Sequence, residues 1–236
     1  MRLHIALAHS IFHAVGPVPE VGIALDRALV LADQIGDSEA QCQIVWAQFG
    51  HYSTLGDYHP MMQNVERARS LAATFPEPIF AATYDRIAAL GFHLLGEQDR
   101  ARQHGLRALN YAAIQRHDGG FVSDHQTASS SHLCRVHWIM GERVRSRSLI
   151  HVTIDRAVRM DQPFAFGYFL AFGACPVSIW SGDLAALRSQ IALLTDTTIG
   201  IPRTIWRISG EFYQRVLDYL EELPGARKER SKSALL

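Results

Sequence analysis

Two groups of residues in this 236-residue chain have types that could do chemistry, and both contain histidine. His9 and His13 stand four residues apart, a spacing that places two imidazoles on one helix face, where they could bind zinc. No cysteine or carboxylate in the surrounding helix completes a zinc shell. We therefore expect this pair to pack or to face solvent, and we expect no metal site.

The second group lies between His117 and His132, where acids and histidines precede the run Ser129–Ser131. A hydrolase needs a nucleophile, a base and an orienting acid that converge in space, and no nucleophile elbow supports such a site here. The chain also lacks the glycine-rich loop with lysine that cradles nucleotide phosphates. We expect no catalytic residue, no cofactor and no enzyme. We interpret the segment as a loop followed by a helix that Ser123 or Asp124 caps.

The charge pattern argues against a nucleic-acid-binding or membrane protein. The chain has 23 basic and 23 acidic side chains, 48% of its residues are hydrophobic, and its two lysines, Lys228 and Lys232, lie near its end. It has no basic stripe that would grip a phosphate backbone and no apolar stretch that looks transmembrane. The excess of arginine over lysine, together with 29 alanines, is typical of a GC-rich bacterial genome.

Cysteine usage favours a reducing compartment. The three cysteines, Cys42, Cys134 and Cys175, lie in apolar stretches and have no metal-ligand spacing. Their number and placement exclude a disulfide framework. The lack of such a framework is typical of cytoplasmic proteins. We therefore expect a cytoplasmic protein.

A repeat organises the elements that would position functional residues. A hydrophobic residue, a glycine and often an acid recur along the chain, and successive glycines are 40, 40, 45 and 41 residues apart. Glycine adopts backbone conformations that other residues resist, so it suits a tight turn between two helices. The repeated glycines are Gly16, Gly56, Gly96, Gly141 and Gly182.

Small residues recur at fixed distances after these glycines. The positions twelve and sixteen residues on differ by four, so they share one helix face, where a neighbouring helix can approach closely. The first set is Ala28, Ala68, Ala108, Thr153 and Leu194, and the second is Ala32, Ala72, Ala112, Ala157 and Thr198.

We predict an all-α fold in which each unit is a helix, a glycine turn and a second helix. The first helices are predicted over 2–14, 38–54, 78–94, 124–139 and 164–180, and the second over 19–35, 58–73, 97–115, 142–160 and 183–196. A final helix over 204–223 caps the stack. Residues 1–223 then form one solenoid domain, and 224–236 form a disordered polar tail.

The turns resemble those of the tetratricopeptide repeats, in which an aromatic residue precedes the glycine by four and a small residue follows it by twelve. The residues that fit are Gly56-Asp57-Tyr58 with Tyr52 and Ala68, and Gly96-Glu97 with Phe92 and Ala108. The period here is longer than that family's roughly 34 residues. In this respect, and in the segments 88–96 and 172–184, the chain is similar to the C-terminal sensor region of bacterial ATP-dependent transcriptional regulators related to the maltose regulator. The resemblance covers about residues 1–222.

The resemblance implies a right-handed solenoid of about five units whose first helices line a concave groove, through positions ten and three residues before each glycine. These positions are Ala6, Trp46, Arg86, Ser131 and Phe172, and His13, Ser53, His93, Trp138 and Ile179. Tryptophan and arginine dominate binding energy at interfaces. The candidate groove-binding residues are Trp46, Arg86, His93, Ser131, Arg135, Trp138 and Phe172. Packing of either tryptophan between adjacent helices stays an open alternative.

Stacking of successive units makes Trp46 and Arg86 neighbours. The pattern therefore predicts that they form a cation–π pair or grip a ligand together. The alternative for Arg86 is a structural ion pair with Asp85 or Glu66.

We expect a non-catalytic binding module of a bacterial signalling or transcription-regulatory system, whose groove holds a protein segment or a partner domain. The alternative is a small-molecule inducer sensor of an ATP-dependent transcriptional regulator. Neither a phosphate-binding loop nor a basic recognition helix occurs in the chain, so this interpretation makes it a detached or truncated sensor region. The expected partners are a protein or peptide, or a small-molecule inducer, with no direct nucleic acid and no membrane. Assembly into a homo-oligomer stays open.

Overall fold

The computed structural model describes residues 1–111, 125–160, 163–196 and 205–222, and every regular element within these ranges is helical. The predicted tail at 224–236 and the predicted cap at Ser123 or Asp124 lie outside the described residues. The helices are α1 (Arg2–Ala14), α2 (Pro19–Ile35), α3 (Ser38–Leu55), α4 (Tyr58–Thr74), α5 (Pro78–Leu94), α6 (Gln98–Asn110), α7 (His125–Ile139), α8 (Arg143–Met160), α9 (Pro163–Phe169), the π-helical segment η1 (Leu170–Ala174), α10 (Cys175–Ser181), α11 (Leu184–Asp196) and α12 (Ile205–Glu222).

The helix ends follow local backbone chemistry. Pro19 and Pro78 open α2 and α5, where the missing N–H of proline breaks no helical hydrogen bond. Asp37 caps α3, because its carboxylate accepts a hydrogen bond from the Ala40 N–H at 2.9 Å. All five repeated glycines have a positive φ, from 70° to 106°, which confirms the predicted glycine turns.

The predicted bounds agree with the structure to within one residue for every helix except α6. The prediction of a helix over 97–115 was wrong, because α6 ends at Asn110. Tyr111 leaves the helix with an extended backbone (φ −68°, ψ 120°), and its hydroxyl donates a hydrogen bond to Asp85 at 3.0 Å. This contact holds Tyr111 against α5.

A π-helical turn interrupts the helix predicted over 164–180. The Cys175 N–H bonds to the Leu170 carbonyl, five residues back, and the next residue, Pro176, has no N–H. The Ala171 carbonyl is thereby left for another donor, and the Tyr213 hydroxyl of α12 donates to it at 2.5 Å. This hydrogen bond ties the last described helix to the middle of α9–α10.

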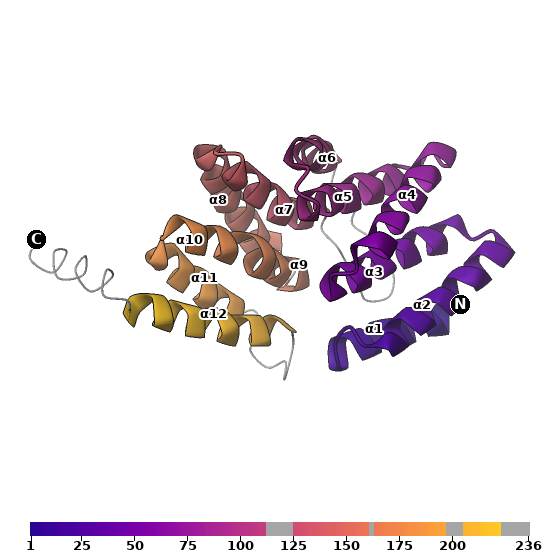
Figure 1. The fold of residues 1–236 in the computed structure, drawn as a ribbon, viewed down its shortest axis with the longest axis horizontal. Helices are drawn as coiled ribbons and strands as arrows, with labels where there is room; N and C mark the ends of the chain where they lie inside the picture. The colour runs from indigo at the N-terminus through magenta and orange to yellow at the C-terminus, as the bar shows by residue number, and fades with distance from the viewer. Residues whose placement is uncertain (112–124, 161–162, 197–204, 223–236) are drawn as a thin grey trace, which may run out of the picture.

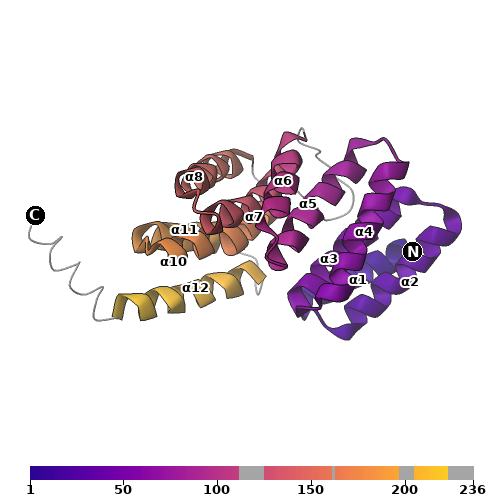
Figure 2. The same cartoon turned by 45° about the horizontal axis from the view of Figure 1, so that its top comes forward.

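Each helix packs mainly against its neighbours in the chain, and the first helices of successive units also contact one another. These contacts join α3 to α5, α5 to α7, and α7 to η1 and α9. In Figures 1 and 2, α5, α6 and α7 lie between α1–α4 on one side and α10–α12 on the other, and α8 lies above α10 and α11. The helices α3, α5, α7 and α9 therefore form a continuous layer through the molecule.

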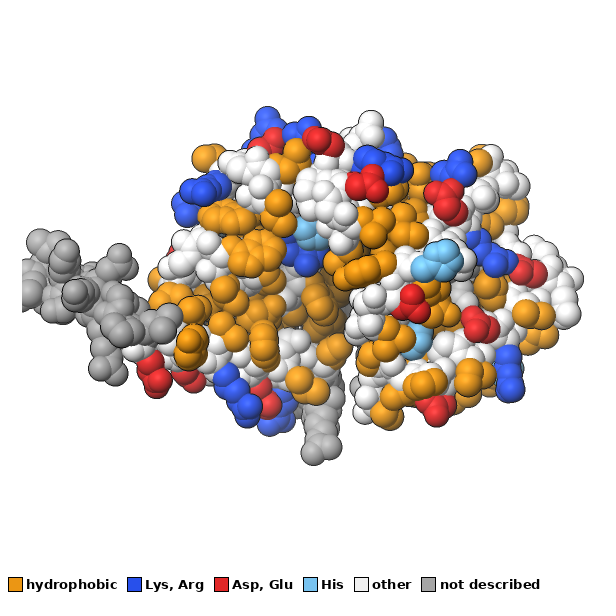
Figure 3. Space-filling view, viewed as in Figure 1, with side chains coloured by type: hydrophobic (Ala, Val, Ile, Leu, Met, Phe, Trp, Pro, Cys, Tyr) orange, Lys and Arg blue, Asp and Glu red, His pale blue; other side chains and the backbone are white. Residues whose placement is uncertain are grey.

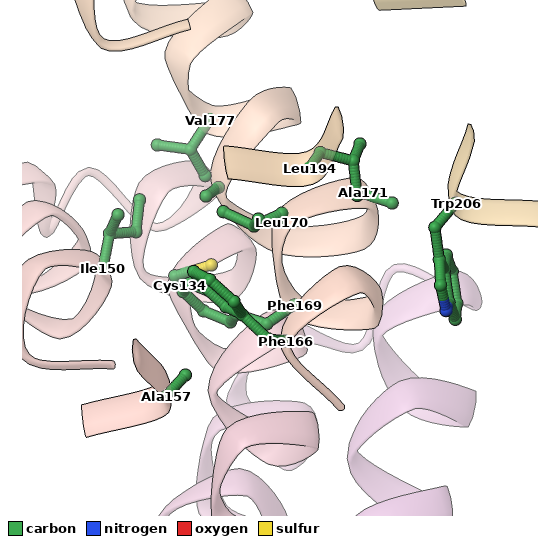
Figure 4. Packing of buried hydrophobic residues seen from close by; sticks show 11 residues of the cluster. Cys134, Ile150, Ala157, Phe166, Phe169, Leu170, Ala171, Val177, Leu194 and Trp206 are labelled. Atoms are coloured by element: carbon green, nitrogen blue, oxygen red, sulfur yellow. The ribbon is translucent and has the colours of Figure 1, made fainter. Parts of the chain in front are cut away.

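The predicted alanine face is buried at most of its described positions, although Ala72 is half-buried. Ala28, Ala68 and Ala108 are each at most 1% exposed, which confirms that helices approach closely there. One large apolar cluster spans α3 to α7, and another spans α7 to α12. In the second cluster, Phe169 and Leu170 lie between α8 and α11 (Figure 4).

Candidate functional site

The layer of first helices brings aromatic, arginine and histidine side chains together. Its first contact joins α3 to α5: the Arg86 guanidinium carbon lies 4.9 Å from the centre of the Trp46 ring. The predicted cation–π pair is confirmed. Arg86 is 5% exposed, so its charge lies inside the protein rather than on its surface.

The acids expected as alternative partners of Arg86 are engaged on other residues. The Asp85 carboxylate lies 2.7 Å from His104 Nδ1 and accepts hydrogen bonds from Arg107 and Tyr111, both at 3.0 Å. Glu66 forms an exposed ion pair with Arg69 at 2.7 Å. Asp85 therefore serves the packing of α5 against α6.

A hydrogen-bonded chain crosses from α7 to α9. Arg135 Nη2 lies 3.2 Å from His132 Nδ1, and His132 Nε2 lies 3.2 Å from the Tyr168 hydroxyl. Arginine can only donate, so Nδ1 of a neutral His132 accepts and its Nε2 carries the hydrogen. That hydrogen is then donated to the Tyr168 oxygen, which fixes the tautomer of the imidazole.

Arg135 is the residue of this group whose polar atoms are least satisfied. Its Nε is shielded from solvent and has no hydrogen-bond partner, and its guanidinium forms no ion pair with the described residues. Burial lowers the pKa of Arg135 because the charged form loses hydration. A buried guanidinium without an opposite charge is costly, since little compensates for its lost water.

The two histidines of this region are neutral at pH 7. Burial, then the Arg135 guanidinium, lowers the pKa of His93 to about 4, although its Nδ1 lies 2.9 Å from Gln98 Oε1. Burial, followed by the charges of Arg135 and Arg86, lowers the pKa of His132 well below its usual value. Both arginines act on His132, so the positive charge here belongs to the guanidiniums.

Aromatic rings, here called the aromatic wall, extend from Tyr168, the last residue of the hydrogen-bonded series. The Tyr168 ring lies edge-on to the His132 ring at 5.7 Å and packs against Phe172 at 5.0 Å. Trp206 of α12 lies 6.1 Å from both Tyr168 and Phe172. Phe172 is 39% exposed, so this wall reaches solvent.

Tyr168 and Trp206 were not among the candidates from the sequence. Tyr168 precedes Phe172 by four residues, and this helical spacing of two aromatics was the signal that could have found it. Trp206 belongs to α12, to which the repeat positions do not extend. Ser131, a candidate from the sequence, is fully buried and donates its hydroxyl hydrogen to the Ala128 carbonyl at 2.6 Å.

Trp138 has a different role from the other candidates. Its ring lies under Arg143 and Arg147 of α8, at 5.3 and 5.9 Å, and it packs against the cluster of α7 to α12. These contacts match the alternative that this tryptophan packs between helices. Of the remaining groove positions, Ala6 is exposed, Ser53 and Ile179 are half-buried, and the His13 side chain lies outside the described part.

The other chemical candidates form no site in the described part of the chain. The described residues contain no group of three or more histidine, cysteine, aspartate or glutamate residues that could hold a metal ion. Cys42, Cys134 and Cys175 are free and buried. Ser129–Ser131 are buried within α7, and the loop before His125 lies outside the described residues.

One face of the molecule is hollowed (Figure 3). Figure 3 shows a hollow in the middle of one face, between α9–α12 and the N-terminal helices. Basic and histidine atoms lie at its upper edge in this view, and most of the atoms around the hollow are hydrophobic. The arrangement suits the capture of a ligand that has a negative group and an apolar body.

Comparison of this chain with protein-family models, with curated protein sequences and with solved structures found no match. Among the described helices, none is long and apolar enough to cross a bilayer.

Proposed function

We propose that this chain is a non-catalytic binding module, a right-handed solenoid of about five tetratricopeptide-like units that holds a ligand against its inner helices. The regular glycine turns and the contacts among α3, α5, α7 and η1 support the solenoid. The resemblance to sensor regions supports a place in a cytoplasmic bacterial signalling or transcription-regulatory system.

The observation that carries the binding proposal is the buried guanidinium of Arg135. A charge without a counter-charge lowers stability, and such costs are typical of binding sites, where the ligand supplies the missing partner. Arg86, stacked on Trp46, adds a second buried guanidinium that acts on the same His132. Trp46, Arg86, His132, Arg135, Tyr168 and Phe172 would line the site.

Two occupants follow from the sequence, a protein segment and a small-molecule inducer, and the geometry favours the small molecule. An extended peptide needs polar groups along an open channel, whereas a small ligand needs a few polar groups that converge inside an apolar hollow. The Arg135 Nε is shielded from solvent, and His132 is 2% exposed. Both lie too deep for a peptide that rests on the surface.

Thermal melts of the purified chain against a panel of small organic acids, sugars and acidic peptides test the proposal. We expect at least one compound to raise the melting temperature of the wild type and to leave that of Arg135→Met unchanged. Arg69→Met is the matched control, because Arg69 is exposed and pairs only with Glu66. A compound that stabilises the wild type and Arg135→Met equally would assign its binding to another surface.

A further inference from the structure

We propose that the site binds a small organic anion with an aromatic ring, with its oxyanion group on Arg135 and its ring against Tyr168 and Phe172. This inference rests on the proposed binding function and names the chemical class of its ligand. It follows from the donors that Arg135 has left, from the charge around it and from the position of the aromatic wall.

The donors of Arg135 fit an oxyanion. Its Nη2 carries two hydrogens, of which His132 takes one, and its Nε hydrogen has no acceptor. Nε and Nη2 lie on one edge of the planar guanidinium, and a carboxylate or sulfonate accepts two parallel hydrogen bonds from such an edge. An anion bound there would satisfy the Nε atom that the protein leaves unpaired.

The surrounding charge selects a negative ligand. Arg86 and Arg135 both act on His132, and His93 and His132 are neutral at pH 7. No carboxylate of the described residues forms an ion pair with Arg135. An anion therefore gains attraction in a region where water screens it weakly, whereas a cation would be repelled.

The aromatic wall selects the body of the ligand. Tyr168 joins the two parts of the site, because its hydroxyl meets His132 at 3.2 Å and its ring packs against Phe172 at 5.0 Å. Phe172 remains 39% exposed, so part of its ring is available to a ligand. Aromatic rings pack well against such a surface in edge-on or offset geometry.

A pair of fluorescent dyes tests this inference on the full chain. The probes are 8-anilinonaphthalene-1-sulfonate and N-phenyl-1-naphthylamine, which share their rings and differ in the sulfonate. We expect Arg135→Met to weaken binding of the sulfonate dye at least tenfold and to leave the neutral dye unchanged. Phe172→Ala should weaken both dyes, whereas Phe212→Ala, at a phenylalanine of α12 that is 59% exposed, should weaken neither.

Competition distinguishes a small aromatic anion from other ligands. Benzoate should displace the sulfonate dye at concentrations where acetate, which lacks the ring, does not. Displacement by an acidic peptide but not by benzoate would overturn the inference and leave a binding module for peptides.

Two further outcomes separate this inference from the proposed function. If each dye binds the wild type and Arg135→Met with the same affinity, the oxyanion site is overturned, while an apolar binding hollow stands. No binding of either dye would overturn this inference, while the proposed function would be contradicted only if no compound of the panel raised the melting temperature. Thermal melts provide the structural control: loss of an unpaired buried charge should keep or raise the melting temperature of Arg135→Met, whereas a scaffold role of Arg135 would lower it.

Discussion

The Arg86 guanidinium lies over the Trp46 indole, 4.9 Å from its centre, and thereby joins α5 to α3. The two residues are 40 positions apart in sequence. The separation equals one period of the glycine repeat, so the two side chains occupy equivalent places in successive units. The strength of this contact therefore depends on how those two units pack against each other.

A double-mutant cycle measures this contact. Trp46→Leu, Arg86→Met and the double variant should give a coupling of about 1–2 kcal/mol in the free energy of unfolding, since cation–π pairs strengthen when water is excluded. The more exposed pair of Arg100 with Phe92, in which Arg100 also binds Glu97, should give about 0.5–1 kcal/mol at most. Zero coupling in urea unfolding would show that Trp46 and Arg86 merely lie close.

Overpacking at the alanine face should destabilise the fold. Ala108 is 1% exposed on α6, so Ala108→Phe forces neighbouring side chains apart and should lower the free energy of unfolding by about 1–3 kcal/mol. Ala73 is exposed on α4, and Ala73→Phe should change it by less than about 0.5 kcal/mol. Equal denaturant midpoints for the two variants would contradict this use of the alanine face.

Gly173 sets the distance between the π-helical turn and α7. A Cβ atom added there would lie 2.8 Å from the Ser131 Cα, and backbone cannot move aside as a flexible side chain can. We expect Gly173→Ala to lower stability by more than about 1 kcal/mol, as overpacking does, and to weaken dye binding by displacing Tyr168 from His132. Gly50 is the control: an added Cβ meets nothing within 4 Å, so Gly50→Ala should stabilise α3 by about 0.5–1 kcal/mol.

Stability should fall as the pH falls below 6.5. The pKa of His93 is about 4 in the folded protein, below its ordinary value of 6.5, so the unfolded chain takes up the proton first. The contribution of neutral His93 to the free energy of unfolding is complete above pH 6.5. It is lost progressively toward pH 4, at up to about 1.4 kcal/mol per pH unit. Burial of His132 acts in the same direction.

The variant His93→Gln isolates the part that comes from His93. Urea unfolding between pH 6.5 and 4 should give a flatter dependence of stability on pH for this variant, by up to one proton. Parallel curves for the variant and the wild type would show that His93 is not the group that titrates.

Helix positions could be predicted because glycine and proline mark the turns by their backbone chemistry. The end of α6 could not, because it depends on a contact of Tyr111 with Asp85 that is absent from the local sequence pattern. The π-helical turn was missed for a similar reason: apart from Gly173, Leu170–Ala174 contains ordinary helix formers, and hydrophobic periodicity does not distinguish a π turn from an α turn.

The candidate site was predicted in part, and the position along each helix explains which part. Trp46 and Arg86 lie ten residues before their glycines, in the middle of a helix, where the neighbouring unit is the nearest surface. Trp138 lies three residues before Gly141, so the helix that begins after the turn is within its reach. His93 shows the same behaviour in its contact with Gln98. Residues near a turn therefore contact the next helix, a rule that a groove assignment from spacing alone overlooks.

The π-helical turn also explains a one-residue irregularity of the repeat. Gly56 and Gly141 each precede a helix-opening proline, Pro78 or Pro163, by 22 residues, whereas the distance from that proline to the next repeated glycine is 18 residues at Gly96 and 19 at Gly182. The additional residue therefore lies inside the helix that contains Leu170–Ala174, where the wider turn absorbs an insertion without moving the glycine out of phase. Deletion of one residue from that turn would restore the spacing of the earlier unit, return the Ala171 carbonyl to the helix and detach Tyr213 from it. The docking of α12 is thus linked to a single inserted residue.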